Sequence, residues 1–128
     1  MSTVIESTSL RAYNDSIRRP ITEIVANVRA ALGAKLVAYV AGVSETRTVR
    51  EWADGARKPS PAAEDRLRLV HRIVALIGQS EGEAVVPTWL QGMNPQLNDR
   101  SPARVLREDA FDEAGPRVLA AANSFVGV

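Results

Sequence analysis

Apolar residues recur along this chain at the three- and four-residue spacing of amphipathic helices, and no stretch alternates apolar and polar positions as a half-buried strand does. The widest apolar face belongs to segment 61–77, which carries Leu67, Leu69, Val70, Ile73, Val74, Leu76 and Ile77. A second stripe follows Pro20 and consists of Ile21, Ile24, Val25, Val28 and Leu32. The pattern predicts an all-α protein with segment 61–77 as its central packing helix.

Turn and cap residues divide the pattern into further helices. Gly42 suits the end of a helix over 34–41, and Ser44 is positioned to cap the next one, which ends at Asp54-Gly55. Ser60-Pro61 opens the central helix, and a break is expected at 78–82. Beyond it we expect a helix through Trp89-Leu90, a turn at Asn94-Pro95, a short helix opened by Ser101-Pro102 and a last helix over 112–125. Residues 1–18 show no period and predict a loose tail.

These boundaries divide the chain into a flexible tail (1–19), a helix-turn-helix domain (20–78) and a small helical C-terminal module (79–128). Charge follows the same division. Residues 1–78 carry twelve Lys and Arg against eight Asp and Glu, whereas residues 79–128 carry four against seven. A basic front and an acidic back are consistent with nucleic acid at the front.

The segment from Leu36 to Trp52 matches a helix-turn-helix, because small and apolar residues stand where its two helices cross: Val37, Ala38, Gly42, Val43, Val49 and Trp52. Its turn is one residue longer than the common spacing. The second helix of such motifs places its N-terminal residues in the major groove. We therefore assign base or phosphate contacts to Ser44, Thr46, Arg47, Arg50, Arg57 and Lys58. An ordinary helical hairpin with solvated arginines is the alternative, and Glu45, Glu51 and Asp54 favour it.

Composition limits the chemistry. The chain has no cysteine, hence no disulfide or thiolate metal site, and its single histidine, His71, fits a helix surface. No histidine-paired nucleophile and no glycine-rich phosphate loop is found. No apolar leader and no bilayer-spanning run is visible. We therefore expect a soluble, cytoplasmic protein that is not an enzyme and needs no cofactor or metal.

The pattern of the acidic back half predicts a docking element. Trp89 stands between Pro87 and Pro95, and the apolar residues around it are too few for an independent core. They must pack on the central helix or on a partner. Trp89 and Leu106 also fit an intramolecular core, and Asn94-Pro95 fits a simple helix stop. The apolar end, residues 123–128 with Phe125 and Val126, is the better candidate for contact with another chain.

Two groups of residues resemble the Xre/MbcA/ParS-type antitoxins over roughly residues 20–125. The first is Gly42-Val43-Ser44, Thr48-Val49, Trp52, Gly55 and Pro59; the more specific second group is Trp89-Leu90, Asn94-Pro95, Leu97, Ser101-Pro102 and Leu106. The resemblance implies an antitoxin that neutralises an NAD-degrading RES-domain toxin by direct contact and represses its own operator DNA, as a homodimer and a hetero-oligomer with the toxin.

Under this interpretation the toxin-binding residues are Trp89, Leu90, Asn94, Pro95, Leu97, Phe125 and Val126. Two alternatives stay open. One is a stand-alone or phage helix-turn-helix regulator that uses the same module. The other is a protein-interaction module whose helix-turn-helix does not bind DNA.

Overall fold

The computed structural model describes residues 7–127, and within them it contains helices and no strand. The elements are α1 (Thr8–Arg18), α2 (Ile21–Leu32), α3 (Ala34–Ala41), α4 (Thr46–Asp54), α5 (Pro61–Glu81), α6 (Val85–Gln91), the 3₁₀ helix η1 (Pro95–Leu97), α7 (Pro102–Glu108) and α8 (Phe111–Val126). An isolated bridge between Asn94 and Arg100 closes the loop around η1. The all-α prediction is confirmed.

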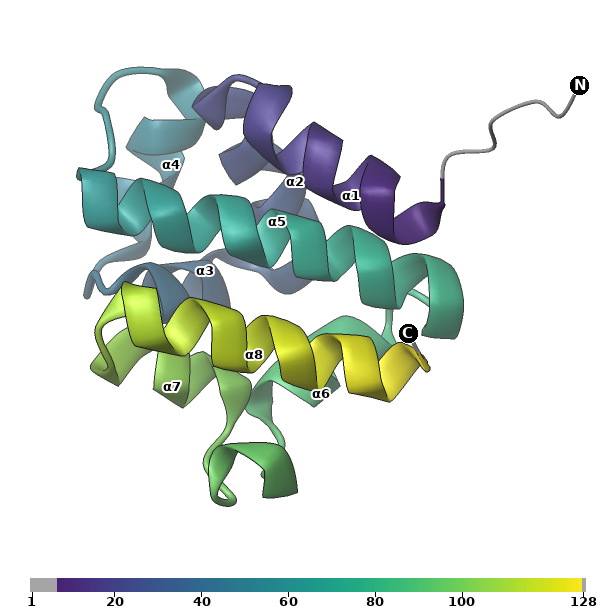
Figure 1. Cartoon of the computed structure of the whole chain (residues 1–128). Helices are drawn as coiled ribbons and strands as arrows, with labels where there is room; N and C mark the ends of the chain where they lie inside the picture. The colour runs from purple at the N-terminus through teal and green to yellow at the C-terminus, as the bar shows by residue number, and fades with distance from the viewer. Residues whose placement is uncertain (1–6, 128) are drawn as a thin grey trace, which may run out of the picture.

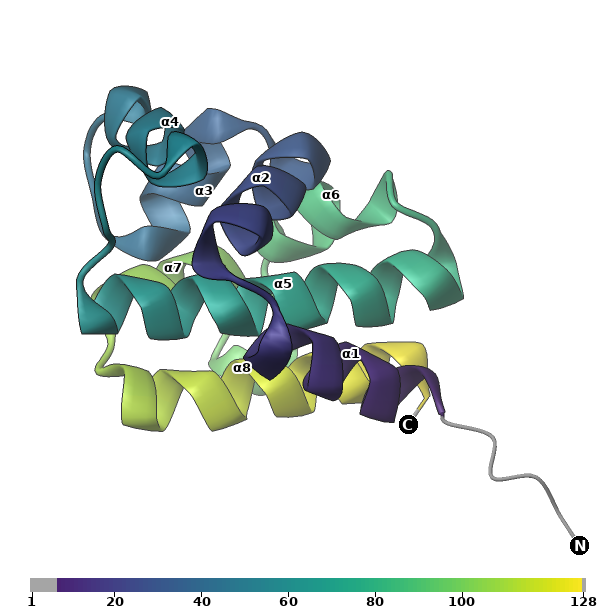
Figure 2. The same ribbon diagram turned by 90° about the horizontal axis from the view of Figure 1, so that it is seen from above.

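Helix α5 lies at the centre of the molecule, as its wide apolar face predicts. It contacts α1, α2, α3, α6 and α8. Figure 1 shows it running between α1 and α8, and Figure 2 shows α1 and α8 on one side of it with α2, α3, α4 and α6 on the other. Its residues Leu67, Val70, Ile73 and Ile77 are fully buried. No helix in the part of the chain described here is long and apolar enough to cross a membrane.

One hydrophobic cluster unites the two predicted helical domains. It includes Val49 and Trp52 from the front half and Leu90, Leu106 and Val118 from the back half. Helix α5 itself passes through Gly78 and ends at Glu81, so the break begins later than expected. A glycine inside a helix costs only about 1 kcal/mol relative to alanine, which the burial of Leu76 and Ile77 beside it offsets.

The expected loose tail is wrong for residues 8–18, which form α1. Ser7 caps this helix by accepting a hydrogen bond from the Leu10 backbone N–H. The side that α1 buries carries Ala12 and Ser16, while Leu10, Tyr13 and Ile17 are exposed. A helix that packs through small residues has no stripe of large apolar side chains facing the core. Such a stripe is the sequence pattern that predicts an amphipathic helix, so the sequence does not predict α1. Residues 1–6 of the predicted tail lie outside the described range.

The caps and turns explain the other helix limits. The Ser60 hydroxyl accepts from the Ala63 N–H at 3.1 Å, as predicted, and Pro61 occupies the first position of α5. Gly42 ends α3 in the left-handed region, with φ of 85°. Ser44 does not cap α4, because the longer turn makes Glu45 the N-cap, and the Glu45 side chain forms no capping hydrogen bond.

Candidate nucleic-acid interface and docking surface

Helix α4 presents a polar face to solvent because its apolar residues are fixed in the core. Val49 is fully buried and Trp52 is 3% exposed. On the other face Thr46, Arg47 and Arg50 are exposed. The separation is what a helix needs in order to offer its first turn to an external partner while staying anchored to α2 and α3, which it contacts.

The charges on this face are partly paired. Glu51 lies 3.4 Å from Arg47 Nε and 3.5 Å from Arg57 Nη1. Both arginine side chains are largely exposed, so the pairs are weak and a phosphate can compete for the guanidinium groups. Lys58 follows in the exposed loop between α4 and α5. Arg47 and Arg57 thus converge near Glu51, whereas Arg50 is exposed one turn along from Thr46 and Arg47.

A depression of about 660 Å³ lies beside the first turn of α4. Ser44, Thr46 and Arg47 line it, together with Lys35 of α3 and Arg107 of α7. A neighbouring depression of about 570 Å³ shares Ser44, Arg47 and Arg107 and adds Arg57. The structure therefore brings four of the six predicted DNA-binding residues around two adjoining hollows. It also adds Lys35 and Arg107, which sequence spacing missed because α7 reaches this site only through the tertiary fold.

The C-terminal surface is built around an aromatic pair. The Trp89 ring on α6 and the Phe125 ring on α8 lie 6.1 Å apart at an interplanar angle of 34°. Trp89 is partly buried against the core and Phe125 is 43% exposed. Val126 is also partly buried. The apolar end is therefore not a free tail, because α8 continues to Val126, and Val128 lies outside the described residues.

The other residues assigned to toxin binding divide into two kinds. Leu90 and Leu97 are fully buried, so they support the surface from beneath and do not lie on it. Asn94 caps η1, its side-chain oxygen accepting from the Gln96 N–H at 3.0 Å, and Pro95 is exposed. The helix-stop interpretation of Asn94-Pro95 describes the local structure well. The exposed apolar groups that remain are Phe125, part of Trp89 and the 81% exposed Met93 on the following loop.

His71 is buried, contrary to the predicted helix-surface position. Its Nε2 lies 2.7 Å from Asp15 Oδ2 of α1, and because a carboxylate only accepts, Nε2 carries the proton. This burial could not be predicted without α1, because residues 8–18 lack the apolar periodicity that would mark them as a helix. Burial alone would raise the pKa of Asp15, but hydrogen bonds from Arg19 and His71 outweigh it, so the pKa lies below the ordinary 3.8.

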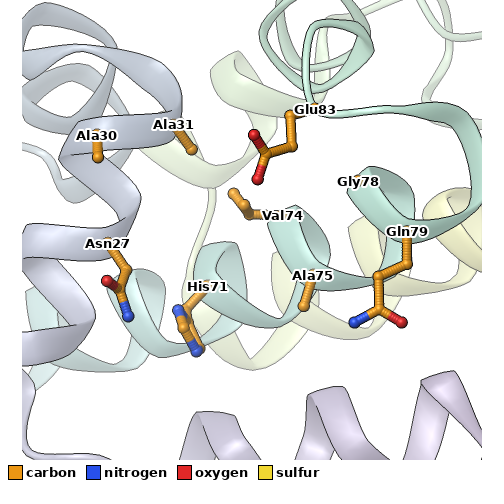
Figure 3. Close-up of a pocket in the computed structure, with 9 residues that line it drawn as sticks. All are labelled: Asn27, Ala30, Ala31, His71, Val74, Ala75, Gly78, Gln79 and Glu83. Atoms are coloured by element: carbon orange, nitrogen blue, oxygen red, sulfur yellow. The ribbon is translucent and has the colours of Figure 1, made fainter.

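The hollow that His71 lines lies between α2 and α5 and measures about 410 Å³ (Figure 3). Its wall is formed by the side chains of Asn27, Gln79 and Glu83 and by small residues, Ala30, Ala31, Ala75 and Gly78. No group of three metal-ligating side chains occurs within residues 7–127.

Comparison with known proteins gives no match: no family model fits the sequence, and no curated protein and no solved structure is similar to it.

Proposed function

We propose that this protein is a DNA-binding antitoxin that reads its operator with α4 and holds a RES-domain toxin at the surface around Trp89 and Phe125. The single observation that carries the DNA part is the exposed first turn of α4, where Arg47 and Arg107 border both hollows and Thr46 and Lys35 border the larger one. Arginine forks onto the acceptor pair of guanine, and lysine or arginine pairs with phosphate. The family resemblance of the two motif groups supports the toxin part.

Selection of duplexes from a random library tests DNA reading. We expect the protein to enrich one sequence, and Arg47→Ala or Arg50→Ala to weaken binding to it by about 1–3 kcal/mol and relax selectivity. Lys58→Ala should weaken all duplexes alike and flatten the dependence on salt. Arg104→Ala is the matched control, because it removes an exposed arginine of α7 that lines neither hollow. Specific binding left intact in an Arg47→Ala, Arg50→Ala double variant would remove α4 from the reading role.

Co-expression with the product of the adjacent gene, followed by co-purification, tests the toxin part. We expect a stable complex and rescue of growth. Phe125→Ala should weaken both, since Phe125 would bury apolar area worth about 25 cal/mol per Å² at the interface. Leu10→Ala is the control, because Leu10 is exposed to a similar degree, on α1. Equal neutralisation by both variants would place the contact elsewhere.

A second candidate is a protein-interaction module without DNA affinity. The observation in its favour is the placement of Glu51 between Arg47 and Arg57, which reduces the positive potential of the α4 face. Under this proposal the selection enriches no duplex, while the complex with the protein partner still forms.

A further inference from the structure

Arg107 belongs to the C-terminal half of the chain, yet its guanidinium lies on the turn that leads into α4. Its Nη1 donates to the Tyr39 carbonyl at 2.9 Å and to the Val43 carbonyl at 3.2 Å. The same guanidinium carbon lies 4.8 Å from the centre of the Tyr39 ring. One side chain of α7 thus contacts the end of α3 and the turn after it at three points.

The Val43 side chain packs against the core, but the far end of the turn has no side-chain cap. At its near end the Val43 N–H donates to the Ala38 carbonyl at 3.0 Å and the Gly42 N–H to the Tyr39 carbonyl at 3.2 Å, which closes α3. At its far end α4 begins at Thr46 after Glu45, whose side chain forms no capping hydrogen bond, whereas Ser60 and Ser101 cap α5 and α7. The hydrogen bond from Arg107 to the Val43 carbonyl holds the chain between those two ends.

We propose that Arg107 is a positioning residue for DNA reading. By holding the Tyr39 and Val43 carbonyls, it fixes the direction in which α4 begins after the connection at residues 42–45. This role rests on the proposed function of α4. Base contacts require side chains to be held to within about 0.5 Å. If the start of α4 is mobile, Thr46 and Arg47 lose their alignment with the bases even when Val49 and Trp52 stay packed in the core. The C-terminal module therefore takes part in DNA reading as well as in partner binding.

The test compares Arg107→Gln and Arg107→Lys with Arg104→Gln. Arg104 lies on the same helix, is exposed and pairs with Glu108 within α7, so its replacement removes the same charge without touching the turn. Two quantities are measured: amide hydrogen exchange of residues 42–48 in the free protein, and affinity for the duplex that the wild type selects. Exchange of the buried α5 amides shows that each variant is folded.

In Arg107→Gln we expect exchange of the turn amides to accelerate about tenfold and specific binding to weaken about tenfold, with α5 unchanged. Arg104→Gln should leave the turn amides and specific binding near wild type. Arg107→Lys keeps the charge but loses the planar group that stacks on Tyr39, so it should recover both quantities together and only in part.

Three results would overturn the proposal. Unchanged turn exchange in Arg107→Gln would show that the turn does not depend on Arg107. Full recovery of DNA affinity in Arg107→Lys with turn exchange still fast would make Arg107 a simple phosphate contact. If the wild type selects no duplex, DNA reading itself fails and this role fails with it, a result distinct from the other two because it appears before any variant is made.

Discussion

The contact between Asp15 and His71 is the main polar link between α1 and the core. Arg68 adds to it from α5 by donating to the Ser16 and Arg19 carbonyls at 3.1 and 2.8 Å. The second nitrogen of His71, Nδ1, is buried and has no hydrogen-bond partner within the described residues. The attachment of α1 therefore includes a contact that depends on the charge state of Asp15.

This dependence predicts a loss of stability in acid. The pKa of Asp15 is lower in the folded protein than in the unfolded chain, so the folded state binds fewer protons in acid and the free energy of unfolding decreases as the pH is lowered. The contribution is full above the unfolded value near 3.8 and disappears as pH falls through the lower folded value. Urea titrations between pH 6 and the acid limit should show a smaller decline for Asp15→Asn than for the wild type. Parallel declines would mean that Asp15 is not the group responsible.

Trp52 and Trp89 should differ in what they contribute to stability. Trp52 is 3% exposed between α4 and the helices it crosses, so Trp52→Ala should lower the free energy of unfolding by about 3–5 kcal/mol. Trp89→Ala should cost less than half as much, because that ring is only partly buried. Chemical denaturation followed by far-ultraviolet dichroism gives both values. A Trp52→Ala variant as stable as the wild type would place the core elsewhere.

At the scale of helices, the sequence predicts an element well where a glycine or a serine–proline pair marks its boundary. Gly42 and Gly55 end α3 and α4 in the left-handed region, and Ser60-Pro61 and Ser101-Pro102 begin α5 and α7 as expected. Helix α1 escapes prediction because its inner side carries Ala12 and Ser16. The prediction that Ser44 caps α4 fails for a different reason. One extra residue in the turn makes Glu45 the residue that precedes the helix.

The packing of α1 through small residues can be tested by enlarging one of them. Ala12 is 3% exposed against α5, so Ala12→Leu should overpack the contact at a cost of about 1–3 kcal/mol and speed exchange of the α1 amides. Arg11→Leu introduces the same side chain at the neighbouring exposed position and should leave α1 protected. If both variants keep the protection of wild-type α1, the added leucine side chain is accommodated in the hollow of about 400 Å³ that Ala12 lines with Ala75 and Gln79.

At the scale of the molecule, the sequence locates the central helix but not the unity of the core. The sequence leaves open whether the apolar residues after Gly78 pack on the central helix or on a partner, because spacing along a chain carries no information on which distant segments meet. Leu90, Leu97 and Leu106 are the main examples. In the structure these leucines are fully buried in the same cluster as Val49 and Trp52. The site residues follow the same rule: α4 is predicted from local pattern, and Arg107 is found only in three dimensions.

A single core predicts a single unfolding transition. Each half holds one tryptophan, so Trp89→Phe and Trp52→Phe variants report separately on the front and the back. Fluorescence from Trp52 in the first and from Trp89 in the second should lose native signal at the same urea concentration, within the change in stability that each substitution causes, as should dichroism within each variant. A fluorescence midpoint separated from the dichroism midpoint in either variant would instead mean that the two halves unfold as independent units.

Helix α5 also sets a geometry. Its 21 residues make a rod about 30 Å long, with α4 near one end and the C-terminal end of α8, the helix that carries Phe125, near the other (Figure 1). Since the rod is buried in the shared core, the two surfaces have no tether or hinge between them and keep one separation and one bearing. Under the proposed function, a toxin held at one end would be carried at a fixed offset from DNA held at the other, so the protein would also act as a spacer.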